Sequence, residues 1–266
     1  MNVDLGTIVE SLKLLGLKKG DTVLVHSSLS SFGYVEGGAK TVIEAIINCV
    51  GEEGTVVVPT LTGKREDGPD NSPIFDVRNT PCWTGRIPNE FMKDLRAKRS
   101  LHPTHSVSVI GPLTDFLIKD HENSITPCGK KSPYYRLAEK GGYILLIGVN
   151  QESNTTLHTI EELAKVPYHM QKVPTNCVII DYDGNRFTRN LYLHDWGTPR
   201  NFQIIDNDLE KFKIMRKGKC GNSTLRLINS SDMIDYVLKK LNDNSEYLVK
   251  NENKDKILNQ VQNNNL

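Results

Sequence analysis

The stretch TVLVHSSLSSFGYVEGGAKTVIEAIINCVGEEGTVVVPT, residues 22–60, predicts the class of fold. Its two ends, residues 22–26 and 55–60, are short, apolar and rich in β-branched side chains, which is typical of buried strands. Between them, residues 39–50 carry apolar side chains at helical spacing, and a glycine-rich turn follows. A strand, a helix and a second strand in this order form a βαβ unit, so we expect a parallel sheet covered by helices on both faces.

Similar patterns continue on both sides of this unit. Residues 4–16 place apolar side chains on one helical face, and residues 106–111 and 142–149 are further strand-like runs. The run at 142–149 is the most continuous, so we expect it at the centre of the sheet. Further helices are expected over residues 87–99, 113–122, 134–140 and 155–165.

The C-terminal part has a different pattern. Asp183-Gly184 separates two β-like runs within residues 177–188, which predicts a hairpin and makes the sheet mixed. A last strand is expected over 223–228, and a helix should follow from Ser230 to Leu241. The patterns together predict an α/β fold: a central mixed, mostly parallel sheet covered by helices, with a β-hairpin in the C-terminal part.

We expect one domain over residues 1–241. Residues 242–266 are rich in asparagine and lysine, which predicts a tail or a loose helix. Residues 62–88 are rich in glycine, proline and charge, and they form a loop longer than a simple connection needs. Loops of this size in compact domains are usually functional or disordered.

Composition excludes several classes of function. The 266 residues include 33 Lys or Arg and 32 Asp or Glu, and this net charge of +1 gives no overall electrostatic basis for nucleic-acid binding. No apolar run approaches the roughly 18 residues of a membrane helix, and the N-terminus lacks the layout of a signal peptide. The five cysteines are scattered with no CxxC pair, which argues against a disulfide framework or a cysteine zinc site and for a reducing cytoplasm. A monomer and a homodimer both remain open.

The first candidate for chemistry is the loop His26-Ser27-Ser28-Leu29-Ser30-Ser31-Phe32-Gly33, which joins the first strand to a helix. Hydroxyls and backbone N–H groups near a helix N-terminus suit phosphate groups. The loop is neither a Walker loop nor a Gly-x-Ser-x-Gly elbow. On composition alone, an anion site and a plain polar turn both remain open.

The second candidate is His158, on the helix after the most apolar strand. Ligands of open α/β sheets bind beyond the carboxyl ends of strands, and Glu161 lies one helical turn from His158 on the same face. Glu152 precedes the helix in the approach loop. A histidine flanked by carboxylates is suited to general-base catalysis, although a surface histidine on a charged helix would give the same spacing.

Two further features could carry chemistry. The segment His102-Pro103-Thr104-His105-Ser106 could be structural or could line a ligand channel. Zinc would need His102, His105 and His158 to converge, and this spacing is weak evidence for that. Cys82 could act as a nucleophile, but no base stands near it in the sequence.

Several segments in order resemble the aminoglycoside 3-N-acetyltransferase family. They include the serine loop with Gly37-Gly38-Ala39, and the stretch Thr84-Gly85-Arg86-Ile87-Pro88-Asn89. The resemblance continues through Arg99–Ser106, Asn154–Glu161 and Lys219–Ser223, and it spans about residues 5–241. No single segment is specific to this family, whereas the ordered set is.

The resemblance implies a fold distinct from the common GNAT acetyltransferases and transfer of an acetyl group from acetyl-CoA. The acceptor would be the 3-amino group of the 2-deoxystreptamine ring of an aminoglycoside, a polyamine-like small molecule, and no metal would be needed. By resemblance, the serine loop would hold the CoA phosphates, and His105-Ser106 would lie along the pantetheine or acetyl end. His158 would be the general base, with Glu161 as its acidic partner.

The chain departs from the family pattern at two places. Many members have aspartate where this chain has Glu152, and the expected acceptor-binding carboxylates, Glu66, Asp67 and Asp70, stand in a segment of mixed charge. Two alternatives therefore stay open: an acetyl-CoA-dependent N-acetyltransferase for another amine, or a non-catalytic CoA- or ligand-binding homologue.

Overall fold

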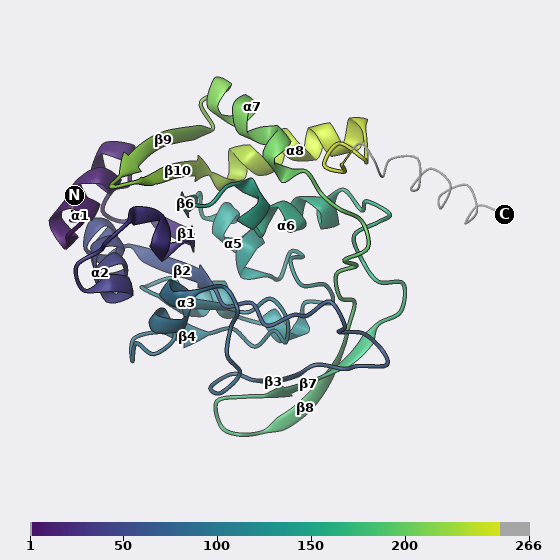
Figure 1. Ribbon diagram of the computed structural model, residues 1–266. Helices are drawn as coiled ribbons and strands as arrows, with labels where there is room; N and C mark the ends of the chain where they lie inside the picture. The colour runs from purple at the N-terminus through teal and green to yellow at the C-terminus, as the bar shows by residue number, and fades with distance from the viewer. Residues whose placement is uncertain (1, 251–266) are drawn as a thin grey trace.

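A computed structural model describes residues 2–250, and its main element is a seven-stranded sheet of order β4-β5-β2-β1-β6-β10-β9 (Figure 1). The strands are β1 (Thr22–Ser27), β2 (Thr55–Pro59), β4 (Lys98–Arg99), β5 (Val107–Ile110), β6 (Tyr143–Ile147), β9 (Met215–Cys220) and β10 (Ser223–Asn229). β1 pairs in parallel with β2 and β6, and the outer strands pair antiparallel. The predicted mixed sheet with a parallel core is confirmed, and the apolar run at 142–149 forms β6 beside the central strand.

Helices cover both faces of this sheet, as predicted. One face packs against α1 (Leu5–Leu15), α2 (Gly38–Val50) and α3 (Arg86–Phe91). The other face packs against α4 (Thr114–Ile118), α5 (Pro133–Glu139), α6 (Thr156–Leu163), α7 (Asp206–Lys211) and α8 (Ser230–Asp243). Val23 and Val25 of β1 enter the first core and Leu24 enters the second, because successive side chains of a strand point to opposite faces.

Short 3-10 helices shape the loops at the carboxyl edge of the sheet and around it. They are η1 (Leu29–Phe32), η2 (His121–Asn123), η3 (Gln151–Ser153) and η4 (Phe202–Ile205). η1 is the predicted serine loop, and η3 lies in the polar approach to α6. Gly148 follows β6 with φ 65°, and a Cβ there would lie 1.8 Å from Ser31 Oγ. Glycine at this position therefore lets the serine loop pack directly against the end of β6.

The predicted C-terminal hairpin exists but lies outside the central sheet. β7 (Thr175–Ile180) and β8 (Arg186–Leu191) form a separate sheet with β3 (Ile74–Asp76), which comes from the long loop at 62–88 (Figure 1). The central sheet is mixed for another reason, since β5, β9 and β10 are antiparallel to their neighbours. The interpretation that this hairpin makes the central sheet mixed was wrong.

The helix expected over residues 87–99 is much shorter. α3 ends at Phe91, and Leu95, expected inward, is fully exposed. The Asp94 carboxylate accepts the backbone N–H of Arg96, which stabilises a turn, and the chain then joins the sheet as β4. Local hydrogen bonding of an aspartate competes with helix formation in this way.

At the C-terminal end, α8 runs to Asp243. Leu248 and Val249 are buried in the core beyond it, and residues 251–266 of the predicted tail lie outside the described residues. All five cysteines are free and buried. Within residues 2–250, no helix combines the length and the apolar character needed to span a bilayer.

Candidate active site

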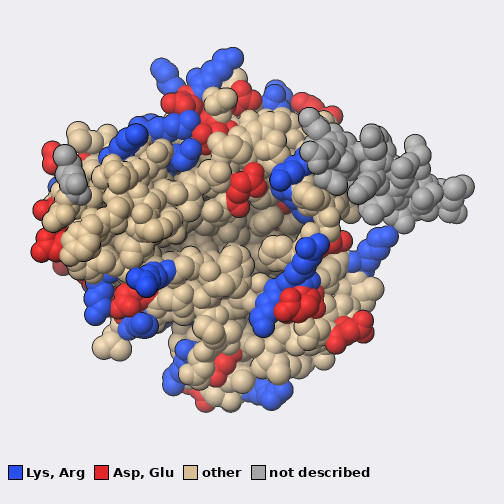
Figure 2. Space-filling model, viewed as in Figure 1, with Lys and Arg blue, Asp and Glu red and all other residues tan. Residues whose placement is uncertain are grey.

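A cavity of about 380 Å³ lies at the carboxyl ends of β1 and β2 and beyond the end of β6. Figure 2 shows a hollow in the middle of this face, bordered mainly by uncharged residues. Parallel strands bring their carboxyl ends to one edge of a sheet, which is where ligands of such folds bind. The cavity is lined by Val25, His26, Ser27, Pro59, Leu61, Trp83, Thr84, Gly85, Pro88, His105, Val149, Glu152, Ser153, Asn154, Thr155, His158 and Trp196.

His158 presents one ring nitrogen to this cavity and the other to a buried carboxylate. Its Nδ1 lies 2.7 Å from Oε2 of Glu161, whose side chain has no exposed surface, whereas 24% of the His158 side chain is exposed. The spacing of three residues on α6 places both groups on one face. Because Nδ1 is engaged by Glu161, Nε2 remains available to a substrate in the cavity.

Glu161 also contacts residues that are distant in the sequence. Arg200 Nε donates to its Oε1 at 3.0 Å, and His169 Nδ1 lies 3.1 Å from its Oε2. Burial raises the pKa of Glu161, but the charge of His169, the hydrogen bond from His158 and the charge of Arg200 together hold this pKa at about 2. Glu161 is therefore a permanent anion behind the His158 ring.

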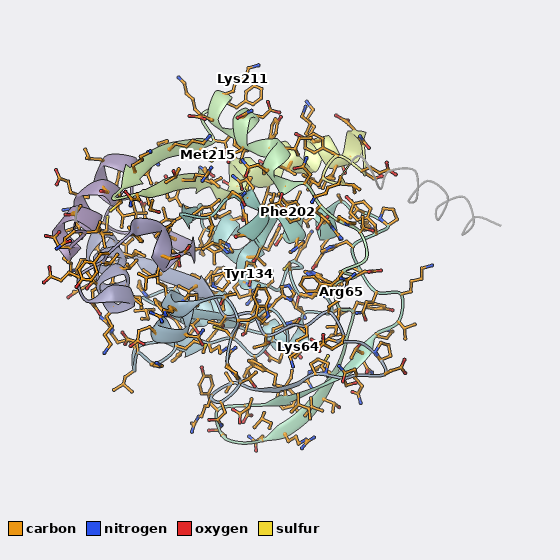
Figure 3. The ribbon with its side chains drawn as sticks, viewed as in Figure 1. Lys64, Arg65, Tyr134, Phe202, Lys211 and Met215 are labelled. Atoms are coloured by element: carbon orange, nitrogen blue, oxygen red, sulfur yellow. The ribbon has the colours of Figure 1, made fainter. Side chains whose placement is uncertain are left out.

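The environment of His158 favours the neutral imidazole. Burial lowers its pKa, Glu161 acts in the opposite direction, and the charges of His169 and Arg200 lower it further. Phe202, labelled in Figure 3, packs edge-on against the His158 ring with ring centroids 5.2 Å apart. A neutral, oriented imidazole with a free Nε2 can accept a proton from an amine.

Glu152 lines the same cavity but has a different contact. Its carboxylate accepts the backbone N–H of Gln203 at 3.2 Å, and its side chain is exposed. The carboxylate in contact with His158 is that of Glu161. Glu152 and Glu161 were both expected beside His158, and the structure separates them. Glu161 lies behind the His158 ring, whereas Glu152 lies on the cavity wall.

A second buried carboxylate, Glu162, follows directly in α6. Its Oε1 accepts the backbone N–H of Cys128 at 2.8 Å and lies 3.3 Å from His194 Nε2. His194 packs against His105, His158 and His169, with ring centroids 4.3, 4.7 and 4.1 Å apart. Burial holds the pKa values of His105 and His194 well below the usual range of histidine, so both are neutral near pH 7.

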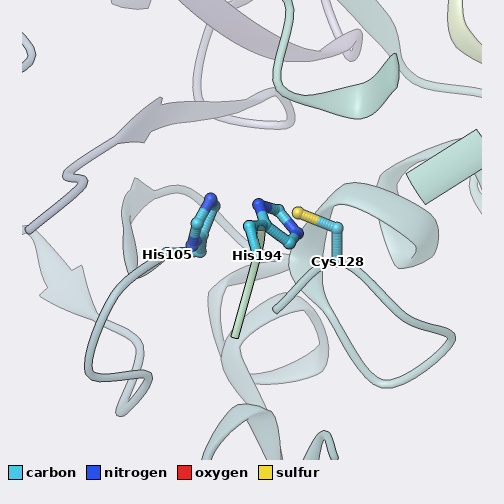
Figure 4. Close-up of side chains that lie close together, drawn as sticks. All are labelled: His105, Cys128 and His194. Atoms are coloured by element: carbon cyan, nitrogen blue, oxygen red, sulfur yellow. The ribbon is translucent and has the colours of Figure 1, made fainter. Parts of the chain in front are cut away.

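The sequence analysis considered His102, His105 and His158 together as zinc ligands, but these three do not form one cluster in the structure. Within residues 2–250, two sets of three potential metal ligands lie within 4.8 Å of one another. One is His105, Cys128 and His194 (Figure 4), and the other is His158, His169 and His194. His102 instead stacks on His121 at 4.6 Å and accepts the backbone N–H of His105, which stabilises the turn before β5.

His105 and Ser106, expected together along the acetyl end, are separated by the structure. His105 lines the cavity, whereas Ser106 is fully buried. The Ser106 hydroxyl donates to the Thr60 carbonyl at 2.8 Å and accepts from Arg99 Nε at 2.9 Å. Ser106 therefore fixes the end of β2 and has no contact with the cavity.

The serine loop divides in a similar way. Ser28, Leu29, Ser30 and Gly33 line a second cavity of about 560 Å³, which shares Ser27 and Gly85 with the first cavity. Ser31 hydrogen-bonds to the Ser28 carbonyl and to Ser223, and Phe32 belongs to the core. Most of the loop thus lines these two cavities, whereas Phe32 packs in the core and Ser31 borders another cavity of about 480 Å³.

Three basic residues that the sequence analysis missed extend this space. A third cavity of about 580 Å³ shares Gly38, Gly85 and Arg86 with the second and is also lined by Lys40 and Lys93. The three cavities share lining residues, and we call them together the path from His158 to the N-terminus of α2. Gly85 lines all three cavities: its φ of 109° favours glycine, and a Cβ there would point into open space.

The acidic residues expected at the acceptor lie elsewhere. Neither Glu66 nor Asp70 borders the cavities described above, and both are exposed. The Asp67 carboxylate is largely buried and accepts the backbone N–H of Lys64, one of the loop residues labelled in Figure 3. The cavity of His158 is lined instead by one acidic residue, Glu152, and by two tryptophans, Trp83 and Trp196.

The comparisons with known proteins agree with this architecture. Residues 24–242 match the sequence profile of the family described as aminoglycoside 3-N-acetyltransferase. The chain is 34% identical to the prophage-derived aminoglycoside N(3')-acetyltransferase-like protein YokD of Bacillus subtilis, over 88% of this chain and 90% of YokD. It is also 34% identical to aminoglycoside N(3)-acetyltransferase IV of a Salmonella species, over 88% of this chain and 85% of that protein.

A solved structure gives the same result for the fold. The apoenzyme of aminoglycoside acetyltransferase AAC(3)-IVa superposes with a TM-score of 0.80 at 29% identity, over 96% of this chain and 94% of the other. The sequence match, the fold and the order of the segments all agree. The chain belongs to the aminoglycoside 3-N-acetyltransferase family.

Proposed function

We propose that the protein transfers the acetyl group of acetyl-CoA to the 3-amino group of the 2-deoxystreptamine ring of an aminoglycoside. The observation that carries this proposal is the neutral His158, held by the buried Glu161 at the wall of a cavity. Relatives named for this reaction cover most of the chain, and AAC(3)-IVa, 30% identical, has been solved in complex with gentamicin.

The chemistry needs a base at this position. An alkyl ammonium is mostly protonated near neutral pH and has no lone pair for attack on a thioester. In the net reaction the ammonium loses two protons, one of which ends on the CoA thiol and the other in solvent. His158 Nε2 takes a proton from the nitrogen as its bond to the acetyl carbon forms, and the carbon–sulfur bond then breaks. No metal is required in this sequence of steps.

The path that leads away from His158 suits the acetyl donor, acetyl-CoA. The acetyl thioester would lie beside His158, the pantetheine chain would pass Ser27 and Gly85, and the phosphates would lie near Ser28, Ser30 and Arg86. Hydroxyls, a guanidinium and the N-terminus of α2 favour anions. AAC-IIIb, a protein of the same fold that is 23% identical to this chain, has been solved as a binary complex with CoASH.

Glu152, Trp83 and Trp196 line the cavity of His158, which supports a role for them in binding the acceptor amine. A carboxylate attracts ammonium groups, and tryptophan faces attract cations and the apolar faces of sugar rings. The cavity of His158 has Glu152 as its single carboxylate among the described residues, which favours a second candidate function: acetylation of an amine with fewer positive charges than an aminoglycoside.

A thiol-release assay tests these alternatives. Acetyl-CoA is combined with a panel of aminoglycosides and with simple amines and aryl amines, and the product is mapped by NMR to the acetylated nitrogen. Aminoglycoside-dependent release with acetylation at the 3-amino group supports the first proposal. Release only with other amines supports the second, and CoA binding without release supports a non-catalytic homologue.

We propose that the protein works in the cytoplasm. Five free, buried cysteines among the described residues are consistent with a reducing cytoplasm. A homodimer is a prediction that sedimentation of the purified protein tests.

A further inference from the structure

Three potential metal ligands meet beside the cavity of His158, and the mechanism above gives none of them a chemical role. His105, Cys128 and His194 each offer one ligand atom, and these three atoms lie within 4.8 Å of one another (Figure 4). They come from the turn before β5, the segment before α5 and the segment after β8, so only the folded chain brings them together. Two imidazoles and one thiol form a donor set that is typical of zinc and related cations.

One carboxylate holds two of these ligands in place. Glu162 Oε1 accepts the backbone N–H of Cys128 at 2.8 Å and lies 3.3 Å from Nε2 of His194. The third ligand is held separately, because Nδ1 of His105 lies 2.9 Å from Oγ1 of Thr104. Metal-binding histidines are usually oriented in this way, with one ring nitrogen on a hydrogen-bonding partner and the other on the ion. Both rings are therefore oriented before any ion binds.

Cys128 is a buried thiol directed toward the His194 ring (Figure 4). Its Sγ has no hydrogen-bond partner within residues 2–250. Burial and the charges of Glu162 and Glu161 raise the pKa of this thiol well above its usual range, so it carries its proton when no ion is bound. A thiol-binding cation displaces that proton to solvent and forms a metal–thiolate bond, whereas Mg²⁺ and Ca²⁺ prefer oxygen ligands.

The three ligands suit a four-coordinate ion with one open position. Zinc–sulfur and zinc–nitrogen bonds of about 2.3 and 2.0 Å place tetrahedral ligand atoms about 3.5 Å apart, so the side chains need to close by about 1 Å. His105 also lines the cavity of His158, which gives an ion a way in and leaves the fourth position to water. An ion bound to one thiolate keeps one positive charge, and the Glu162 carboxylate beside His194 offsets it.

The second set of potential ligands, His158, His169 and His194, is less suitable. It contains no thiol, so it has no anionic sulfur ligand. In addition, Nδ1 of His158 and Nδ1 of His169 already lie 2.7 and 3.1 Å from Oε2 of Glu161. The set with Cys128 is therefore the one that we expect a thiol-binding cation to select.

We propose that His105, Cys128 and His194 bind a thiol-binding divalent cation such as Zn²⁺, and that the filled site opposes acetyl transfer. The ion is not a resident cofactor: the transfer needs no metal, and the ion-free protein is the active form. A cation on the wall of the cavity of His158 repels the ammonium group of an acceptor that enters the same cavity. Binding of the ion is independent of the proposed function, whereas the inhibition rests on it.

Binding is tested with Co²⁺ as a spectroscopic probe in the full-length protein, first dialysed against EDTA and then freed of it. CoA is left out, because its thiol also binds such ions. The native protein should bind one Co²⁺ per chain with a thiolate-to-metal charge-transfer band. Zn²⁺ should remove this band and Mg²⁺ should not.

Cys128→Ser should lose the charge-transfer band. The matched control is Cys82→Ser, which should keep it. Cys82 is also buried and directly precedes two residues that line the cavity of His158, but it belongs to neither set of potential ligands.

Calorimetry with Zn²⁺ measures the affinity of the site. His105→Gln and His194→Gln should each weaken binding by at least about 10²-fold, since loss of an outer hydrogen-bond partner alone costs about 10–100-fold. These two variants keep the test decisive if Cys128→Ser folds poorly. The rise in native Tm on addition of Zn²⁺ should vanish in the same variants.

The inference is wrong if the native protein shows no charge-transfer band, if Cys128→Ser retains the band, or if Cys82→Ser loses it. Co²⁺ bands that persist in Cys128→Ser but vanish in His158→Ala would assign the ion to the second set, and this too would overturn the proposal.

Inhibition is measured as the initial rate of amine acetylation by mass spectrometry, before CoA accumulates. Zn²⁺ should lower this rate in the native protein, and the ratio of rates with and without Zn²⁺ should stay near one in Cys128→Ser. Turnover that is unaffected by bound Zn²⁺ would refute the inhibitory role. Zn²⁺ binding in a protein that acetylates no amine would refute the proposed function and leave the metal site in place.

Discussion

Oε2 of Glu161 lies 2.7 Å from Nδ1 of His158, and the Glu161 side chain has no exposed surface. This pair connects the interior of the protein to the cavity at the carboxyl ends of β1 and β2, because His158 also lines that cavity. A buried anion behind an imidazole fixes its tautomer and stabilises the imidazolium that forms during proton transfer.

His158→Ala should lower kcat by about 10²–10⁴-fold, because it removes the general base. CoA binding should survive, since the residues near the expected phosphates are remote from His158. Thiol release gives the rate, and the CoA-dependent rise in Tm gives binding. An alanine variant with nearly full activity and an unchanged pH profile would refute the role of His158.

Glu161→Gln and Glu152→Gln should change different properties of the protein. The first should lower kcat by about 10²-fold or more by removing the charge behind the imidazole. It should also lower stability by about 3 kcal/mol, because Arg200 loses a buried partner. Glu152→Gln should raise KM for the amine and leave kcat and stability nearly unchanged. Equal effects of the two substitutions on kcat would contradict this division of roles.

Arg86→Gln and Ser28→Asp should weaken CoA binding. The first removes a cation from the path and the second places an anion beside the expected phosphates, so each should raise Kd by about tenfold, or 1.4 kcal/mol. The effect should decrease at high salt. Calorimetry measures Kd, and Lys98→Gln, an exposed position outside the path, is the control. Unchanged affinity in both variants would place the CoA site elsewhere.

Stability should fall in mild acid. Burial lowers the pKa of His26 and of His121 to about 3, and the pKa values of His102, His105 and His194 also lie well below the usual range. The unfolded chain therefore binds more protons than the native protein below about pH 6.5, and the stabilising effect is complete only above that pH. Each of these five histidines should lower the free energy of unfolding by about 1.4 kcal/mol per pH unit below 6.5. A urea midpoint that stays constant between pH 7.5 and 5 would contradict this expectation.

Removal of metal ions should leave activity and Tm unchanged, because attack of an amine on a thioester needs no metal. Dialysis against EDTA, followed by assay and thermal melting, provides the measurement. Activity that is lost on chelation and restored by zinc would instead assign a metal to His105, Cys128 and His194. Cys128→Ser would then abolish the restoration.

Features that depend on neighbouring residues could be predicted from the amino-acid sequence. The βαβ unit follows from two short apolar, β-branched runs and the helical periodicity between them in residues 22–60, and that unit places the ends of β1 and β2 at one edge. The pairing of His158 with Glu161 follows from three-residue spacing on one helix. These geometries are set by the local backbone, so they can be predicted before the chain is folded.

Contacts that depend on the paths of long loops could be found only in the folded structure. Arg200, His169 and His194 reach Glu161 and Glu162 from segments with no local signal of their destination. The same holds for Trp83 and Trp196, which lie on the cavity wall, and for Ser106, whose hydroxyl is buried against Thr60. Periodicity specifies which side chains leave water, but it does not specify which distant polar groups will share a buried carboxylate. That choice is made by packing, which brings segments together and leaves each buried charge with the partners that it requires.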